Sequence, residues 1–261
     1  MKRILAAAAL AALAGSAAAQ TSAPNPAQTP APASRSFNAV YTISGGGVQA
    51  GEFLYGVKFE GGAYEATARR RMTGLVGALV GNSQNFSYAA NGRVTAQGLA
   101  PERYHHSGGK RNRLVSVDFT GPQSVTTAVP VMGMGHPPAT PEQRAGAVDQ
   151  VSAIAGMIAA SGDPCSRTVH VLMDGRSLFD FVMSPNGRVN VNTRAYRGQA
   201  VRCSVQFRPI AGFPDPQPPA TLTFLFAPAG NGLFAPLRIE MPTDIEQIGV
   251  AVLEARSFKV T

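Results

Sequence analysis

Apolar and polar residues alternate through most of the chain from residue 35 onward. In the segment 53–60, aromatic and aliphatic side chains take every second position, and Lys58 and Glu60 stand between them. This period of two is typical of a strand with one buried face. Turn residues such as Gly61-Gly62 and Asp174-Gly175 separate the alternating segments. The pattern predicts a mainly β domain built of hairpins.

Similar segments recur at short, regular spacing. Asn91-Gly92 and Gly108-Gly109 are interpreted as the turns of two further hairpins. Short strands joined by turns predict a curved antiparallel sheet or a half-open β-barrel. The predicted strands are 53–60, 64–72, 84–90, 93–97, 103–107, 114–120, 124–131, 168–174, 177–184, 188–196, 200–208, 221–227, 237–241 and 250–260.

One segment has a helical period instead. Thr140-Pro141-Glu142 combines an N-cap residue, a first-turn proline and an acidic first turn. Apolar residues then recur at three- and four-residue spacing up to Ile158, and Gly162 is expected to end the helix. We predict one main helix, Glu142–Ser161, packed across the sheet. The stretch Leu75–Val80 is compatible with another helical turn, although its glycines disfavour one.

The N-terminus has the pattern of a secretory signal peptide. Lys2 and Arg3 precede an apolar run, and small residues follow up to Ala19. We predict a signal peptide at residues 1–19 with cleavage between Ala19 and Gln20, and therefore a periplasmic or secreted protein. No later segment has the length of a transmembrane helix, so the mature chain is expected to contain none.

The segment after the predicted cleavage site is rich in proline and alanine. Residues 20–35 contain few bulky apolar side chains and predict a disordered linker. The remaining residues, 36–261, predict a single β-rich domain. Without Lys2 and Arg3 the chain has 21 basic and 15 acidic side chains, a net charge of +6. In an exported protein this charge favours an anionic envelope partner, a lipid or an acidic glycan, over nucleic acid.

The chain contains two cysteines, Cys165 and Cys203. In an oxidising compartment a single pair predicts a disulfide. Their spacing is not the Cys-x-x-Cys of redox dithiols. Two cysteines without a His-x-x-His spacing do not predict a zinc site, and nothing else in the sequence indicates a metal or a cofactor.

Candidate catalytic residues are few, and none forms a known motif. Among the four histidines, His105 and His106 are adjacent on a predicted strand, so their side chains should point to opposite faces. A hydrolase would need one of them together with a carboxylate such as Asp118. We predict no catalytic residue. A hydrolase that uses His105 or His106 stays an open alternative.

Basic residues interleaved with aromatic ones are the main candidate for a binding site. They gather on neighbouring predicted hairpins and would suit an anionic amphiphile or an acidic polymer. The alternative is an ordinary solvated face whose charges prevent edge-to-edge aggregation. The predicted ligand-binding residues are Arg69, Arg71, Arg103, Tyr104, Lys110, Arg111 and Arg113.

The order of several short motifs resembles an exported bacterial family, that of domain of unknown function 3108. The motifs are Tyr41-x-Ile43 before a Gly-rich turn, the run 98–104 (GLAPERY), Val148-Asp149-x-x-Ser152, Pro164-Cys165, and Asp174-Gly175-Arg176. The resemblance implies a curved antiparallel sheet with helical cover, similar to the half-barrels of periplasmic lipoprotein carriers. The family carries no agreed activity, so the resemblance transfers no catalytic residue.

Three functional hypotheses follow. The first is a non-catalytic envelope protein that binds an amphiphilic or anionic ligand such as a lipid or a polysaccharide. The second is a structural or assembly module that pairs an exposed strand edge with a partner. The third is an envelope hydrolase that uses His105 or His106. An empty concavity beneath the helix would favour carriage of a ligand, and a filled interior would favour a scaffold.

Overall fold

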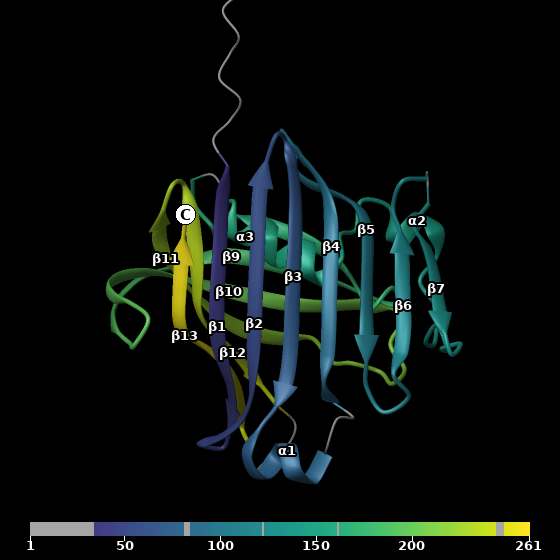
Figure 1. The fold of residues 1–261 in the computed structure, drawn as a ribbon, viewed down its shortest axis with the longest axis horizontal. Helices are drawn as coiled ribbons and strands as arrows, with labels where there is room; N and C mark the ends of the chain where they lie inside the picture. Colours follow the sequence, from purple (N-terminus) through teal and green to yellow (C-terminus); the bar gives the residue numbers. More distant parts are fainter. Residues whose placement is uncertain (1–33, 81–83, 122, 161, 244–247) are drawn as a thin grey trace, which may run out of the picture. The chain divides into compact units, whose positions relative to one another are not determined.

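The protein folds into one large antiparallel sheet, seen in a computed structural model that describes residues 34–80, 84–121, 123–160, 162–243 and 248–261 (Figure 1). The predicted signal peptide, with its cleavage site at Ala19–Gln20, and most of the predicted linker lie outside the described residues. None of the helices in the described ranges is long and apolar enough to cross a membrane.

Thirteen strands and three short helices make up the described part of the chain. The strands are β1 (Arg35–Gly45), β2 (Val48–Glu60), β3 (Ala63–Met72), β4 (Phe86–Thr95), β5 (Gly98–Gly108), β6 (Arg113–Asp118), β7 (Val125–Val129), β8 (Arg167–Met173), β9 (Ser177–Asn192), β10 (Arg197–Ala211), β11 (Ala220–Gly230), β12 (Leu233–Pro242) and β13 (Val250–Val260). The helices are α1 (Gly74–Val80), α2 (Pro141–Arg144) and α3 (Gln150–Ile158).

The strand order shows how hairpins build the sheet. From one edge to the other it is β7-β6-β5-β4-β3-β2-β1-β13-β12-β11-β10-β9-β8. Every neighbouring pair is consecutive in sequence except β1 and β13, which join the first half of the chain to the end of the second. Strands β7 and β8 are the two edges, so the sheet is curved but not closed. The predicted fold class, a mainly β half-open sheet with one main helix, is confirmed.

Two predicted strand breaks are wrong. The segments 84–90 and 93–97 form the single strand β4, and 177–184 and 188–196 merge into β9, which ends at Asn192. Gly92 lies at a register shift inside β4 rather than in a turn. A Cβ atom at Gly92 would lie 2.2 Å from the carbonyl oxygen of Ala100 and 2.9 Å from the Tyr64 ring. The glycine therefore permits a close approach of backbones within the sheet.

The predicted helix Glu142–Ser161 is also wrong in its extent. It is divided into α2 and α3 by residues 145–149, where Gly146 has a φ of +74°. Val148 there forms an isolated parallel bridge with Val171 of the edge strand β8. Asp149 then starts α3, because its carboxylate accepts hydrogen bonds from the backbone N–H groups of Val151 and Ser152, both at 2.9 Å.

Helix α3 fills the interior of the curved sheet. It contacts β3, β4 and β5 in one half of the sheet and β8 and β12 in the other, and Figure 1 shows it behind β2–β4. Tyr55 donates a hydrogen bond of 2.9 Å from its hydroxyl to the carbonyl oxygen of Val151. The Tyr64 hydroxyl lies 2.7 Å from Ser152 Oγ. The space beneath the helix is therefore a packed core.

The buried side chains extend this core through both halves of the sheet. Beside α3 they form one large cluster and two smaller ones, and the smaller ones are rich in phenylalanine. The Cys165–Cys203 disulfide, predicted from the sequence, lies in this phenylalanine-rich region with both cysteines fully buried. It joins the segment after α3 to β10.

Candidate functional site

The outer face of the sheet, opposite α3, has an unusual row of paired residues across six strands. The strand register pairs Lys259 of β13 with Asn38, then Gly56, Thr67 and Ala89, and finally His105 of β5. Directly paired residues point to the same face. At a strand separation of about 4.8 Å, the row is about 24 Å long.

The next row toward α1 runs parallel to the first. It contains Ser257, Val40, Leu54, Arg69, Ser87 and Ser107 in register. Both rows consist mainly of small side chains, so they lie lower than the long side chains around them. The sheet is therefore hollowed across its strands rather than along them.

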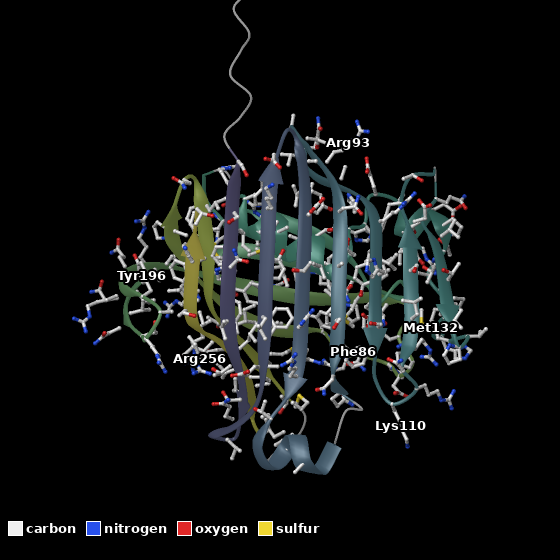
Figure 2. The ribbon with its side chains drawn as sticks, viewed as in Figure 1. Phe86, Arg93, Lys110, Met132, Tyr196 and Arg256 are labelled. Carbon is white, nitrogen blue, oxygen red and sulfur yellow. A yellow bond between two sulfur atoms is a disulfide. The ribbon has the colours of Figure 1, made fainter. Side chains whose placement is uncertain are left out.

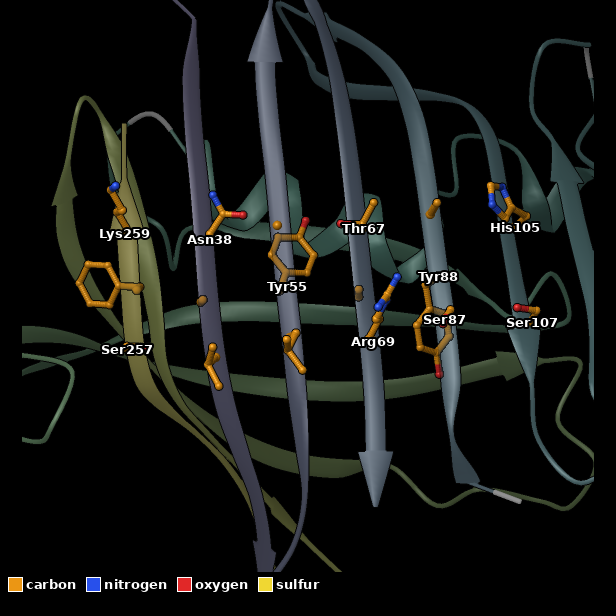
Figure 3. A pocket seen from close by; sticks show the side chains of 17 residues that line it. Asn38, Tyr55, Thr67, Arg69, Ser87, Tyr88, His105, Ser107, Ser257 and Lys259 are labelled. Atoms are coloured by element: carbon orange, nitrogen blue, oxygen red, sulfur yellow. The ribbon is translucent and has the colours of Figure 1, made fainter. Parts of the chain in front are cut away.

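This hollow has a volume of about 710 Å³. Figure 3 shows its side chains on β13, β1, β2, β3, β4 and β5. Its polar contributors are Asn38, Thr67, Ser87, Ser107 and Ser257, and its basic ones are Arg69, Lys259 and His105. We call it the transverse hollow.

A second hollow of about 430 Å³ adjoins the first near α1. The two share Arg69, Ser87 and Ser107, so they are continuous. The second adds Arg70, Arg71 and the Gly108-Gly109 turn, and we call it the arginine end.

The charged side chains among the lining residues of the two hollows are basic. Neither hollow has an aspartate or glutamate among its lining residues. Within the described residues, Arg69 and Arg71 take part in no ion pair. Glu52 is opposite Arg71 in the register, but its carboxylate is bound by the Arg256 guanidinium at 2.9 Å. The two free guanidinium groups are therefore available to an anion.

Arg70 has a structural task. It is on the other face of β3, and its Nε and Nη2 atoms donate to Gln84 at 3.2 and 3.1 Å. Its guanidinium lies 4.7 Å from the centre of the Phe86 ring. These contacts hold the start of β4 against β3.

The other predicted binding residues are not all brought into this site. Lys110 and Arg111 are exposed in the turn between β5 and β6, where Figure 2 shows Lys110 pointing away from the sheet. Arg113 donates to the carbonyl oxygens of Pro130 and Val131 at 2.9 and 3.4 Å. Arg103 is on the outer face but opposite Asp118 in the register.

Tyr104, another predicted binding residue, lies apart from both hollows, because its side chain is buried on the inner face. Its hydroxyl accepts a 2.6 Å hydrogen bond from Gln150 Nε2. The same hydroxyl lies 3.2 Å from Asp174 Oδ1 and 2.9 Å from His106 Nδ1. Gln150 also donates to Asp174 at 2.6 Å. This network joins β5, α3 and the β8–β9 turn. Alternation along β5 explains this placement, since Arg103 and Tyr104 necessarily point to opposite faces.

The two adjacent histidines are also divided between the faces, as predicted. His106 is buried in the network of Tyr104, and burial lowers its pKa below the ordinary value. His105 is exposed and lines the transverse hollow. The carboxylate of Asp118 accepts hydrogen bonds from the N–H and hydroxyl groups of Thr120 at 2.8 and 2.6 Å. In the described ranges, neither histidine has a hydrogen bond or ion pair with Asp118.

A third histidine has a carboxylate partner elsewhere. His170 Nδ1 lies 2.5 Å from Asp180 Oδ1, and its Nε2 lies 2.7 Å from the carbonyl oxygen of Gln143. This contact fastens α2 to the β8–β9 hairpin. Among the described residues, no three His, Cys, Asp or Glu side chains gather as a metal site.

Comparison with solved structures gives a likeness of fold. A solved structure, "Crystal Structure of Beta-barrel-like Protein of Domain of Unknown Function DUF1849 from Brucella abortus", has 9% sequence identity and a TM-score of 0.48. The likeness covers 87% of this chain and 98% of that one. No family model matches the chain. No curated protein matches it either. The resemblance to domain of unknown function 3108 thus stays a prediction.

Sequence reasoning missed most of the transverse hollow. It singled out Arg69 but not Asn38, Lys259 or the serines of the second row. These residues come from strands far apart in the chain, and each is an ordinary polar position of an alternating pattern. The one indication in the sequence is the small size of outer-face residues such as Gly56 and Ala89. Small residues indicate a hollow only when the strand register places them next to one another.

Proposed function

We propose that this protein is a non-catalytic binding module whose outer sheet face binds an anionic ligand of the cell envelope. The observation that carries the proposal is the continuity of the two hollows, which combine free guanidinium groups of Arg69 and Arg71 with no lining carboxylate. An anion placed there meets charge-assisted donors, and the nearest carboxylate in the register, that of Glu52, is paired with Arg256.

The packed interior directs the proposal to the outer face. The Tyr55–Val151 and Tyr64–Ser152 contacts occupy the space beneath α3 where a carried lipid tail would have to lie. Carriage of a ligand would need an empty concavity beneath the helix. The filled interior therefore disfavours carriage inside the sheet. Binding at a polar, open surface suits the charged part of a lipid or a polysaccharide.

The proposed compartment is the periplasm. Its supports are the signal-peptide pattern at residues 1–19 and the Cys165–Cys203 disulfide, which is compatible with an oxidising environment. The positive charge of the mature chain also suits the anionic polymers and lipids of an envelope.

The test compares two double variants with equal loss of charge. Arg69→Gln with Arg71→Gln removes the free cations of the site. Arg194→Gln with Arg197→Gln removes two exposed cations, one between β9 and β10 and one at the start of β10. Binding is measured by co-sedimentation with phosphatidylglycerol vesicles and by calorimetry with polygalacturonate, at two salt concentrations.

We expect at least one anionic probe to bind, and more weakly at the higher salt. The Arg69/Arg71 variant should lose affinity about tenfold or more, because each lost charge-assisted contact contributes about 1.5–3 kcal/mol. The Arg194/Arg197 variant should stay close to wild type. Equal losses in both variants, or no binding to either probe, would refute the proposal.

A second candidate is an assembly module that adds a partner's strand to β7. Strand β7 is an edge, and Val125 and Val129 on its outer face are 59% and 71% exposed. An exposed apolar edge strand is a template for pairing with an extended segment of another protein. Val129→Lys should reduce crosslinking of β7 to a partner in envelope extracts, and unchanged crosslinking would exclude this edge.

A further inference from the structure

The geometry of the transverse hollow points to the class of ligand. We infer that it binds an elongated acidic polysaccharide, which lies across the strands from β13 to β5. This inference rests on the proposed function and specifies its ligand.

The first reason is the direction and length of the hollow. Lys259 and His105 mark the two ends of one row that crosses five strand spacings, about 24 Å. Arg69 lies between them on β3, in the adjacent row. A compact anion would contact one of these basic groups at a time. A chain with repeated acidic groups can contact all three.

The second reason is the chemistry of the floor. Along its whole length the hollow offers short hydroxyl and amide side chains, from Ser257 and Asn38 at one end to Ser107 at the other. Such groups can exchange hydrogen bonds with the hydroxyl groups of sugar rings. Ala89 keeps the floor low, so a flat ring can approach the sheet there. Gly56 leaves room for the Asn38 amide, whose Oδ1 would lie 2.8 Å from a Cβ atom at Gly56, so that the amide faces the ligand over this strand. Val40 and Leu54 add apolar surface for the C–H faces of the rings.

The third reason distinguishes a polysaccharide from a membrane surface. The outer side chains of both rows include no phenylalanine, tyrosine or tryptophan, whereas binding at a membrane interface commonly uses these residues as anchors. The basic groups also border a recessed floor, which a flat bilayer cannot enter. A single extended chain can enter it.

The experiment measures affinity against ligand length. The probes are galacturonate oligomers from the monomer to the hexamer, with phosphatidylglycerol vesicles as the competing class, and binding is measured by calorimetry on the full-length protein. We expect affinity to rise about tenfold or more from monomer to hexamer as further sites are engaged. Wild-type protein should prefer the hexamer to the vesicles.

Two variants locate the chain on the sheet. Lys259→Gln should weaken the hexamer about fivefold or more and leave the monomer, held at Arg69, unchanged. Ala89→Trp fills the floor and should abolish the gain with length. The control Lys58→Gln removes the same charge from the same face outside the hollow, where Lys58 pairs with Glu60, and should bind the hexamer as the wild type does. Circular dichroism and thermal unfolding verify that each variant is folded.

The outcomes separate this inference from the proposed function. Affinity that depends on Arg69 but not on oligomer length would overturn the polysaccharide and leave an anion-binding module. So would binding to vesicles without binding to any oligomer. A hexamer affinity that Lys259→Gln and Lys58→Gln reduce equally would overturn the placement across the strands. A wild-type protein that binds neither the oligomers nor the vesicles would overturn both proposals.

Discussion

Thr126 donates a hydrogen bond of 2.7 Å from its hydroxyl to the backbone carbonyl oxygen of Gly175. Thr126 belongs to the edge strand β7, and Gly175 lies in the turn between β8 and β9, at the opposite edge of the sheet. The two edges thus meet through a side chain where no strand ladder closes the sheet. A Cβ atom at Gly175 would lie 2.6 Å from Thr126 Cγ2 and 2.7 Å from Val117 Cγ2.

This contact predicts an unequal cost for two glycine substitutions. Gly175 and Gly187 have φ angles of +65° and +78°, but a Cβ atom at Gly187 would meet nothing within 4 Å. We expect Gly187→Ala to cost about 1–2 kcal/mol from backbone strain alone. Gly175→Ala should cost about 1–3 kcal/mol more through overpacking. Urea unfolding of both variants measures the difference, and equal losses would show that the edges are not in contact.

The buried network of Tyr104 should stabilise the same junction. Tyr104→Phe removes the hydroxyl that accepts a hydrogen bond from Gln150. The other polar groups of the network, on Gln150, Asp174 and His106, are then left with fewer hydrogen-bond partners. We expect a loss of about 1–3 kcal/mol in the free energy of unfolding. Tyr196→Phe is the control, because its hydroxyl bonds an exposed carbonyl oxygen at Gln199, and it should change stability by less than about 0.5 kcal/mol. Similar values for the two variants would contradict a stabilising role.

Asp149 should make stability depend on pH. Burial raises the pKa of its carboxyl to about 6, although the hydrogen bonds from Ser152 and Val151 act to lower it. Because the folded-state pKa lies above the unfolded value of 3.8, the folded protein binds this proton more tightly. Its contribution to stability therefore decreases as the pH rises from about 4 to about 6, by about 3 kcal/mol at most.

Asp149→Asn keeps an N-cap acceptor and removes this titration. The stability of wild type relative to the variant should therefore fall between pH 4 and pH 6 in urea unfolding. Asp163→Asn is the control of opposite sign. Hydrogen bonds from the Cys165 N–H and the Ser166 hydroxyl lower the Asp163 pKa, so its stabilisation is lost as the pH falls below the unfolded value of 3.8, and this comparison extends below pH 4. Slopes of the same sign in both comparisons would contradict the assignment.

The disulfide should supply a large part of the stability of the second half of the sheet. It closes a loop with a sequence separation of 38 residues, which corresponds to about 4 kcal/mol in the chain-entropy description. The double variant Cys165→Ser, Cys203→Ser should lose about 2–4 kcal/mol and unfold at the same urea concentration as the reduced wild type. A reduced wild type as stable as the oxidised one would refute this.

Local chemistry explains why hairpins were predicted correctly at some turns and wrongly at others. Gly61-Gly62 and Asp174-Gly175 lie at chain reversals, and Asp174 adopts the left-handed conformation that such turns require. Asn91-Gly92 is also a typical turn dipeptide, but it lies inside β4. There the glycine accommodates the backbone of β5, and a contact with a neighbouring strand leaves no signature in the local sequence.

The helix was predicted in the right place with the wrong extent. Its apolar period continues through Val148, but Val148 pairs with β8 instead of joining a helix. The predicted helix includes Asp149, which in the structure is the N-cap of α3. The sequence shows only that Val148 is apolar and Asp149 polar. Which hydrogen bonds they form depends on the nearby edge strand β8.

The sequence by itself determined the mainly β character, the inner and outer faces of strands such as β2, and the cysteine pair. These follow from alternation and composition, which are local properties of the chain. Only the tertiary structure decided which edges meet at Gly175, that the interior is filled by α3, and that Lys259, Asn38, Arg69 and His105 line one hollow. The physical reason is that strand register acts between segments distant in sequence, so a row across the sheet exists only after the strands have paired.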